Sequence, residues 1–215
     1  MLKVLKFITA AILATALLQG SAFAATKKSS IQLSDEQRAA IARVNDYINS
    51  FTTLRGDFVQ MSDKGQSVKG VVMLSKPGKI RFDYAPPSPL LIVSDGKWLT
   101  IKNKIKERGD QVPLSATPLR LIVAPKIDLL AETLVLSVED VDGFTSVALA
   151  DKKDQMGGHI VLVYDNAQDT LQQWIIVDGK GRRTTVQFAN LERDVQLNQK
   201  LFMETIKRKN NEKRN

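Results

Sequence analysis

The chain has 215 residues, carries 31 lysines and arginines against 23 aspartates and glutamates, and contains no cysteine. The lack of cysteine excludes disulfides, a catalytic thiol and a lipid attached to an N-terminal cysteine. The net charge of +8 does not indicate a nucleic-acid partner, because the basic residues do not cluster around aromatic side chains.

The first 24 residues have the pattern of a cleaved secretory signal peptide. Lys3 and Lys6 form a basic start, residues 7–18 form an apolar run too short to span a bilayer stably, and Ala22-Phe23-Ala24 is a small-x-small cleavage site. The alternative, an N-terminal membrane anchor, is disfavoured because polar residues interrupt the apolar run after residue 18. We therefore predict that the mature chain lies outside the cytoplasm.

The mature chain is long enough to bury one core, since a chain of this size buries roughly 70% of the surface that it exposes when unfolded. We predict a signal peptide at 1–24, a polar leader at 25–33, a single domain at 34–203 and a basic tail at 204–215. The tail is interpreted either as a solvated end or as a weak contact to an anionic membrane surface or an acidic partner.

One amphipathic helix is predicted at the start of the domain. Ser34 and Gln37, three residues apart, form the pattern of a capping box. The apolar residues that follow recur at helical spacing and form one stripe: Ile41, Val44, Ile48 and Phe51.

From Asp57 onward, apolar and polar residues mostly alternate, which is typical of strands. Turn sequences such as Asp95-Gly96 and Asp178-Gly179 separate the runs. We predict eleven strands, at 57–62, 68–74, 79–84, 90–94, 97–102, 104–108, 134–139, 144–149, 159–164, 171–178 and 183–190. So many short strands indicate a mainly β fold in which a large antiparallel sheet curls. The continuous apolar run at 90–93 predicts a strand covered on both faces.

Two short helical segments interrupt the sheet. Thr117-Pro118 predicts an N-cap followed by proline in the first helical turn, Leu119, Ile122 and Val123 follow at helical spacing, and residues 127–132 add another turn. This insertion and the first helix are expected to cover one concave face of the sheet. The interior is then either an ordinary core or an apolar cavity with a lid, because the same residue types line both.

No catalytic constellation is evident. His159 is the only histidine and is predicted to lie in a strand, no Gly-x-Ser-x-Gly elbow supplies a nucleophile, and one histidine is too few for a catalytic zinc. The glycines follow turns and form no phosphate-binding fingerprint. A pair of carboxylates acting on glycosides stays open, although no pair stands out. We predict a non-enzymatic protein without a metal or cofactor.

Several short segments are informative as a set. They are Asp57-Phe58-Val59-Gln60, residues 75–84 (SKPGKIRFDY), Pro87, residues 93–98 (VSDGKW), Gln111-Val112 and Thr117-Pro118-Leu119. In this order and spacing, spread over residues 34–203, they resemble the LolA family of periplasmic carriers of outer-membrane lipoproteins.

The resemblance implies an open, unclosed β-barrel with a helical lid over an apolar cavity. It also implies a carrier that takes triacylated lipoproteins from an inner-membrane ABC lipoprotein-release complex to an outer-membrane acceptor, in the periplasm of a Gram-negative bacterium. We expect a monomer. The alternative is a periplasmic lipid-binding sensor or regulator, or a small-lipid binding protein, on the same half-barrel.

In the family, an arginine just before the motif proline locks the lid by binding backbone carbonyls of the helices. The resemblance places Lys76 and Pro77 at this position, and lysine lacks the planar fork of arginine. The lock is then either weaker or made by Arg81 or Arg120, while Lys76 as a solvated turn residue is the alternative. The predicted acyl-chain cavity consists of Ile41, Ile48, Ile80, Phe82, Tyr84, Leu90, Ile92, Trp98, Leu119, Ile122 and Val123.

Overall fold

A computed structural model describes residues 31–152 and 157–204 of the chain. The predicted signal peptide, most of the polar leader and all but the first residue of the basic tail lie outside the described residues. No helix in the described part is long and apolar enough to cross a bilayer.

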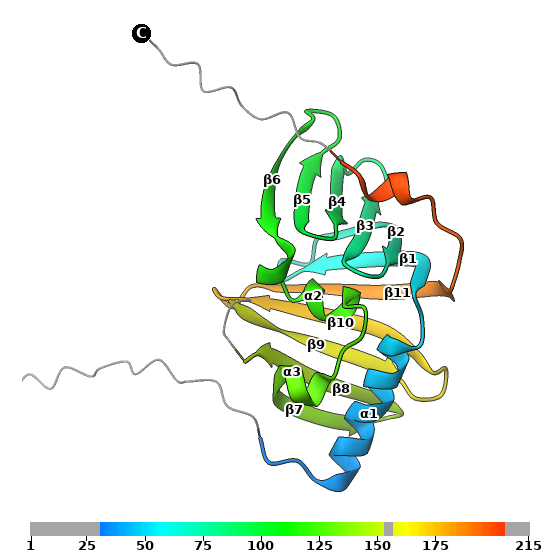
Figure 1. Cartoon of the computed structure of the whole chain (residues 1–215). Helices are drawn as coiled ribbons and strands as arrows, with labels where there is room; N and C mark the ends of the chain where they lie inside the picture. Colours follow the sequence, from blue (N-terminus) through cyan, green and yellow to red (C-terminus); the bar gives the residue numbers. More distant parts are fainter. Residues whose placement is uncertain (1–30, 153–156, 205–215) are drawn as a thin grey trace, which may run out of the picture.

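The fold is one antiparallel sheet of eleven strands in the order β6-β5-β4-β3-β2-β1-β11-β10-β9-β8-β7 (Figure 1). The edge strands β6 and β7 do not pair with each other, so the sheet is unclosed, as predicted. The strands are β1 (Thr53–Ser62), β2 (Ser67–Ser75), β3 (Lys79–Tyr84), β4 (Leu90–Asp95), β5 (Trp98–Asn103), β6 (Arg108–Pro113), β7 (Thr133–Val141), β8 (Phe144–Asp151), β9 (Gly158–Asp165), β10 (Thr170–Asp178) and β11 (Arg183–Arg193).

The prediction of a strand at 104–108 was wrong. Residues 104–107 form the turn between β5 and β6, and β6 begins only at Arg108. The Asn103 side-chain oxygen accepts hydrogen bonds from the backbone N–H groups of Ile105 (3.0 Å) and Lys106 (2.9 Å). This local side-chain contact competes with strand pairing, and it leaves Ile105 80% exposed.

The first helix, α1 (Asp35–Asn49), begins at the predicted capping box. The Ser34 hydroxyl accepts from the Gln37 backbone N–H (3.3 Å), and the Gln37 side chain accepts from the Ser34 backbone N–H (3.0 Å). The amide nitrogen of Gln37 also donates to the Val138 carbonyl of β7 (3.4 Å), and the Ile31 N–H donates to the Val135 carbonyl (3.1 Å). The start of the domain therefore lies along the free edge of β7.

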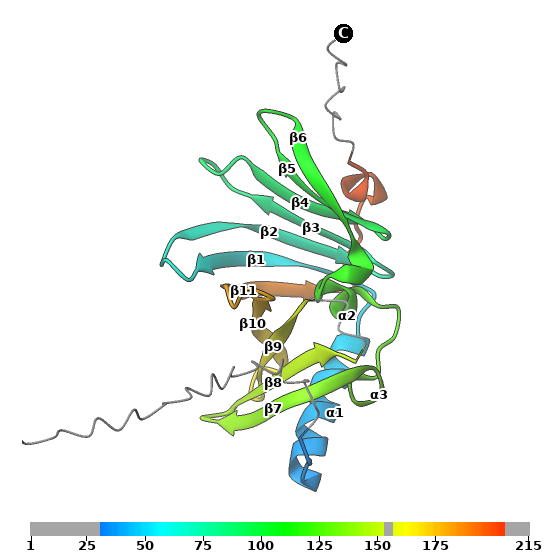
Figure 2. The same cartoon turned by 90° about the vertical axis from the view of Figure 1, so that its left-hand side faces the viewer.

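Three short helical elements connect β6 to β7: η1 (Leu114–Ala116), α2 (Leu119–Val123) and α3 (Leu129–Glu132). Thr117 is not the predicted N-cap of α2, because its hydroxyl instead donates to the Leu114 carbonyl (2.9 Å) and closes η1. Figure 2 shows α1, α2 and α3 gathered at one end of the sheet, whereas the β1–β2 hairpin at the opposite end extends beyond them. We call the face that the helices cover the inner face.

Apolar side chains are buried on both faces of the sheet. The main core lies between the inner face and the helices. On the outer face, a smaller cluster joins Leu91 and Val93 of β4 to Phe202 of the C-terminal turn η2 (Gln199–Phe202). Leu90 and Ile92 pack on the inner face, so the prediction that this strand is covered on both faces is confirmed.

Candidate ligand-binding cavity

The strand β3 brings three predicted residues, Ile80, Phe82 and Tyr84, to the inner face, where each is at most 4% exposed. Phe58 of β1 packs edge-to-face on Phe82 and Tyr84, with ring centroids 5.1 and 5.0 Å apart. The burial alternates strictly along β3, which follows from the period-two geometry of a strand. This aromatic cluster forms the floor of the inner face.

An apolar pocket of about 290 Å³ lies on this floor, and we call it the open pocket. It lies between the start of α2 and strands from both halves of the sheet. Its lining is mostly apolar, with polar side chains from Gln60, Thr117 and Thr184. The lining residues are Gln60, Phe82, Tyr84, Ile92, Leu99, Thr117, Pro118, Leu119, Trp174, Ile176, Thr184 and Val186.

A second apolar pocket lies under α1 and α2, and we call it the closed pocket. Its free volume is only about 20 Å³, so its lining side chains nearly fill it. It shares Trp174 with the open pocket. The lining residues are Tyr47, Ile48, Phe51, Leu54, Val72, Leu74, Ile80, Ile122, Leu171, Trp174, Phe188 and Leu191.

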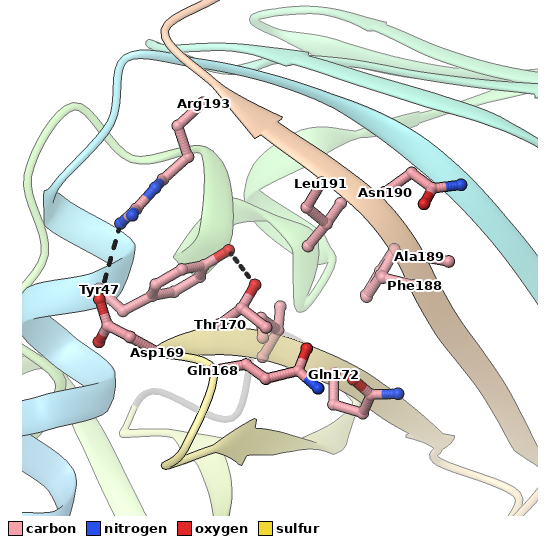
Figure 3. Close-up of a pocket in the computed structure, with 11 residues that line it drawn as sticks. Tyr47, Gln168, Asp169, Thr170, Gln172, Phe188, Ala189, Asn190, Leu191 and Arg193 are labelled. Atoms are coloured by element: carbon pink, nitrogen blue, oxygen red, sulfur yellow. Dashed lines mark hydrogen bonds and ion pairs between the residues drawn. The ribbon is translucent and has the colours of Figure 1, made fainter.

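A third pocket, of about 300 Å³, lies on the far side of Tyr47 and is lined by mostly polar side chains (Figure 3). The Tyr47 hydroxyl hydrogen-bonds the Thr170 hydroxyl (3.2 Å), and the Arg193 guanidinium pairs with the Asp169 carboxylate at 4.0 Å. Four residues line both this polar pocket and the closed pocket and lie between them: Tyr47, Leu171, Phe188 and Leu191. Its polar lining does not suit hydrocarbon.

The size of the open pocket limits what it holds in this conformation. An apolar cavity of ~150 Å³ accommodates benzene, so a pocket of about 290 Å³ takes roughly a dozen carbon atoms by the same measure. A larger apolar ligand requires the closed pocket to open. Since α1 and α2 cover the closed pocket, the contacts that hold these helices decide the capacity of the cavity.

Lys76 lies at the C-terminal end of α1. Its amine donates to the Ile48 carbonyl in the last turn of the helix and lies 4.4 Å from the centre of the Phe51 ring. A cation is favourable there because the carbonyls of the last helical turn carry partial negative charge. Burial lowers the pKa of Lys76 to about 8, and the Asp194 carboxylate partly opposes this shift.

The turn that follows Lys76 also contacts α2. The Gly78 N–H donates to the Val123 carbonyl at the end of α2 (2.7 Å). Gly78 has a φ of +78°, and a Cβ at this position would lie 2.6 Å from the Cα of Gly96. Only glycine therefore allows the turn to take this path, which brings Lys76 to one helix and Gly78 to the other.

Two asparagines of α1 hold the segment that links α2 to α3. Asn49 and the backbone of Ile127 form two hydrogen bonds, one from the Asn49 amide to the Ile127 carbonyl (2.8 Å) and one from the Ile127 N–H to the Asn49 oxygen (2.9 Å). The Asn45 oxygen accepts from the Leu129 N–H (3.1 Å). The helices are thus joined to one another as well as to the sheet.

The two arginines considered as replacements for Lys76 lie elsewhere. Arg81 is on the outer face, where it donates to the Leu201 carbonyl (2.8 Å) and pairs with Asp83 (2.9 Å). Arg120 of α2 pairs with the buried Asp151 at the end of β8 (2.7 Å). Arg120 therefore holds α2 to the sheet, whereas Arg81 does not contact the helices through these bonds.

The predicted cavity residues separate into three groups. Phe82, Tyr84, Ile92 and Leu119 line the open pocket, and Ile48, Ile80 and Ile122 line the closed pocket. Ile41, Leu90 and Val123 pack in or against the main core and line neither of these pockets. For all of these residues, contact with a ligand stays a prediction.

Trp98 requires a correction. The register pairs Leu99 of β5 with Ser94 and Ile101 with Ile92, so Leu99 faces inward and Trp98 lies on the outer face, 39% exposed. Leu99, and not Trp98, lines the open pocket.

Sequence reasoning missed the contribution of the last strands. Trp174 and Ile176 of β10 and Val186 of β11 line the open pocket. The register of β10 shifts between Leu171 and Gln173, so Leu171 and Trp174 face the same side although they are three residues apart. A simple alternation pattern does not predict this, because a bulge inserts one residue into the period.

The chain is similar to known outer-membrane lipoprotein carrier proteins. The family model described as "Outer membrane lipoprotein carrier protein LolA" matches residues 49–205. The outer-membrane lipoprotein carrier protein of Xanthomonas oryzae pv. oryzae is 28% identical over 196 residues, 86% of each chain. That of Methylococcus capsulatus is 28% identical over 171 residues, 75% of this chain and 81% of the relative. The crystal structure of a LolA superfamily protein from Nitrosomonas europaea covers 78% of this chain and 97% of its own, with 7% identity and a TM-score of 0.46.

Proposed function

We propose a carrier function from the premise that this chain belongs to the LolA family of outer membrane lipoprotein carrier proteins, whose model matches residues 49–205. The chain binds the acyl chains of lipoproteins released from the inner membrane and delivers them to the outer membrane. The observation that carries the proposal is that two apolar pockets, the open pocket and the closed pocket, share Trp174 as a lining residue, and that α1 and α2 cover the closed pocket.

The energetics of the cargo explain why a carrier is needed. Each CH₂ group removed from water contributes about 0.8 kcal/mol, so the acyl chains of one lipoprotein carry tens of kcal/mol of transfer free energy. Such a molecule does not cross an aqueous compartment unaided. A carrier must also release it, and helices that refill the closed pocket lower the net affinity, because the cargo has to displace protein contacts first.

The proposal assigns roles to the predicted site residues. The acyl chains occupy the open pocket and, once α1 and α2 separate from each other and from the sheet, the closed pocket. Lys76 and Pro77 form the lock of this lid, supported by the contact of the Lys76 amine with the Ile48 carbonyl. The carrier domain spans residues 34–203, which include every helix and strand from α1 to η2. No step of this function is catalytic.

The partners and compartment follow from the same premise. Triacylated lipoproteins are the cargo, an inner-membrane ABC release complex supplies them, and an outer-membrane acceptor receives them where one is present. The curated relatives carry the name of outer-membrane lipoprotein carrier, which supports the periplasm of a Gram-negative bacterium as the compartment. The carrier acts as a monomer without nucleic acid, metal or cofactor.

The test is mass spectrometry of the lipid-bearing molecules that co-purify with the protein from the periplasm. We expect triacylated lipoprotein on the wild-type chain and none on Phe82→Glu, because a carboxylate in the apolar open pocket disfavours hydrocarbon. Ile105→Glu, in an exposed turn, is the matched control and should retain the cargo. Circular dichroism establishes that each variant is folded. A wild-type protein that holds only a free small lipid would contradict the carrier role.

A further inference from the structure

Trp174 stands out among the buried side chains. It is 3% exposed, and within residues 31–152 and 157–204 its Nε1 is the only buried side-chain nitrogen or oxygen without a hydrogen-bond partner. Buried donors in folded proteins are nearly always paired, since an unpaired donor loses its hydrogen bonds to water and gains none. An orphaned donor of this kind needs an explanation, such as an acceptor that a ligand brings.

Two aromatic rings pack against the indole of Trp174. Phe82 and Phe188 pack edge-to-face against the indole, with centroids 5.7 and 4.7 Å away. Trp174 is the only residue that lines both the open pocket and the closed pocket. The unpaired N–H group therefore belongs to the one side chain at the junction of the two apolar spaces.

We propose that the Nε1–H of Trp174 donates a hydrogen bond to an acyl carbonyl oxygen of the bound lipid, an ester or an amide. This inference rests on the proposed function and goes beyond it, because it makes the cavity selective for acyl groups over plain hydrocarbon. A hydrocarbon tail provides no acceptor, whereas the carbonyl that joins each tail to its head group provides one.

The same contact sets the orientation of the lipid. A carbonyl at Trp174 leaves the rest of the lipid on the side of the open pocket, whose lining includes the polar side chains of Gln60, Thr117 and Thr184 beside its apolar ones. The hydrocarbon beyond the carbonyl then extends toward the closed pocket, whose lining is apolar apart from the Tyr47 hydroxyl, which is paired with Thr170. Trp174 thus acts as a positioning residue that fixes how deep the acyl chain enters.

The first experiment leaves the protein unchanged and varies the lipid. Calorimetry compares a synthetic tripalmitoylated S-glyceryl-cysteine lipopeptide with two analogues, one with ether links in place of the glyceryl esters and one with an N-alkyl amine in place of the N-acyl amide. We expect the analogue that lacks the contacted carbonyl to bind about 3- to 10-fold more weakly, the range for loss of one hydrogen bond. The analogue that weakens identifies the ester or the amide as the acceptor.

The second experiment removes the donor. Trp174→Phe keeps an aromatic ring but has no N–H, and Trp98→Phe on the outer face is the matched control because the chain has only these two tryptophans. Trp174→Phe should bind the parent lipopeptide about 3- to 10-fold more weakly and should no longer distinguish it from the weakened analogue. Trp98→Phe should behave as wild type in both respects.

The third readout does not depend on any substitution at Trp174. In Trp98→Phe labelled with nitrogen-15, a single indole N–H resonance remains, and its proton should move downfield when the lipopeptide binds and less with the weakened analogue. The inference is overturned if both analogues bind within about twofold of the parent, or if the indole proton does not move on binding. Failure of wild type to bind the lipopeptide at all would instead overturn the carrier function.

Discussion

The open pocket and the closed pocket are lined by the same kinds of side chain and share Trp174, yet their free volumes are about 290 and 20 Å³. The difference lies in what covers them. Tyr47 and Ile48 from the end of α1, and Phe51 just after it, line the closed pocket, whereas α2 reaches the open pocket only with its first residue, Leu119. The comparison teaches that a core and a cavity here differ in the helices above them rather than in the residues beneath them.

Polar contacts at a few positions add to the apolar packing that holds the helices on the sheet. The helices bury apolar side chains such as Ile48 and Ile122 in the main core. Lys76 holds the end of α1, Gly78 holds the end of α2, and Asn49 joins α1 to the segment after α2. Net hydrogen-bond contributions are about 0.5–1.5 kcal/mol each. The proposed function requires these contacts, and the apolar packing beneath them, to separate while the strands of the sheet stay paired.

The largest effect on lipopeptide binding is expected from a disulfide that joins α1 to the segment after α2. The chain has no cysteine, so the double variant Asn49→Cys, Ile127→Cys introduces the only pair that can form a disulfide. The oxidised form should bind no triacylated lipopeptide, because the open pocket alone is too small, and a reductant should restore binding. Calorimetry with and without the reductant measures this, and the two single variants are controls. Full binding by the oxidised form would show that the lipopeptide does not need the closed pocket to open.

A smaller effect, on stability and local opening, is expected from removal of the hydrogen bonds between Asn49 and Ile127. Asn49→Ala leaves the N–H and carbonyl of Ile127 without their side-chain partners and should lower the free energy of unfolding by about 1–3 kcal/mol. Hydrogen exchange at the Ile127 amide should become faster. Asn103→Ala is the matched control, since Asn103 also accepts from two backbone N–H groups, but at the β5–β6 turn. Equal exchange rates at Ile127 in Asn49→Ala and wild type would show that this contact does not hold the lid.

The smallest effect concerns the titration of Lys76. In the folded state burial lowers the pKa of this amine to about 8, from its ordinary value of 10.5. Between these pH values the unfolded state binds more protons, so the contribution of Lys76 to the free energy of unfolding rises as pH increases from about 8 to about 10.5. The difference between wild type and Lys76→Met, measured by chemical denaturation across this range, should rise accordingly. A constant difference would mean that the amine is solvated, as in the alternative interpretation of this turn residue.

Much of the fold could be predicted because the spacing of apolar residues changes from helical spacing to alternation where the chain passes from α1 into the strands. The stripe from Ile41 to Phe51 and the capping box predicted α1, and the alternation of Ile80, Phe82 and Tyr84 predicted the inner face of β3. The turn at residues 104–107, where we predicted a strand, could not be recognised in this way. The contacts of Asn103 with the turn, which decide it, concern one side chain and leave no periodic signal.

The candidate site was less accessible to sequence reasoning than the fold. Trp98 and Leu99 differ by one position, and only the pairing of β5 with β4 decides which of them faces inward. The side of the sheet on which Trp174 lies likewise depends on tertiary pairing, because a bulge in β10 precedes it. The contacts of Asn45 and Asn49 link α1 to residues 78 or more positions away, and no local pattern predicts such a distance.

The unclosed sheet leaves two strand edges, and each is protected in a different manner. Along β7, Ile31 and Gln37 occupy carbonyls that another strand would use. Along β6, the charges of Arg108 and Asp110 and the missing N–H of Pro113 oppose pairing with a further strand. If β6 of one molecule paired with β7 of the next, the head-to-tail contact would repeat from molecule to molecule and build a ring or a fibre. The contacts at the two edges of the unclosed sheet thus oppose polymerisation.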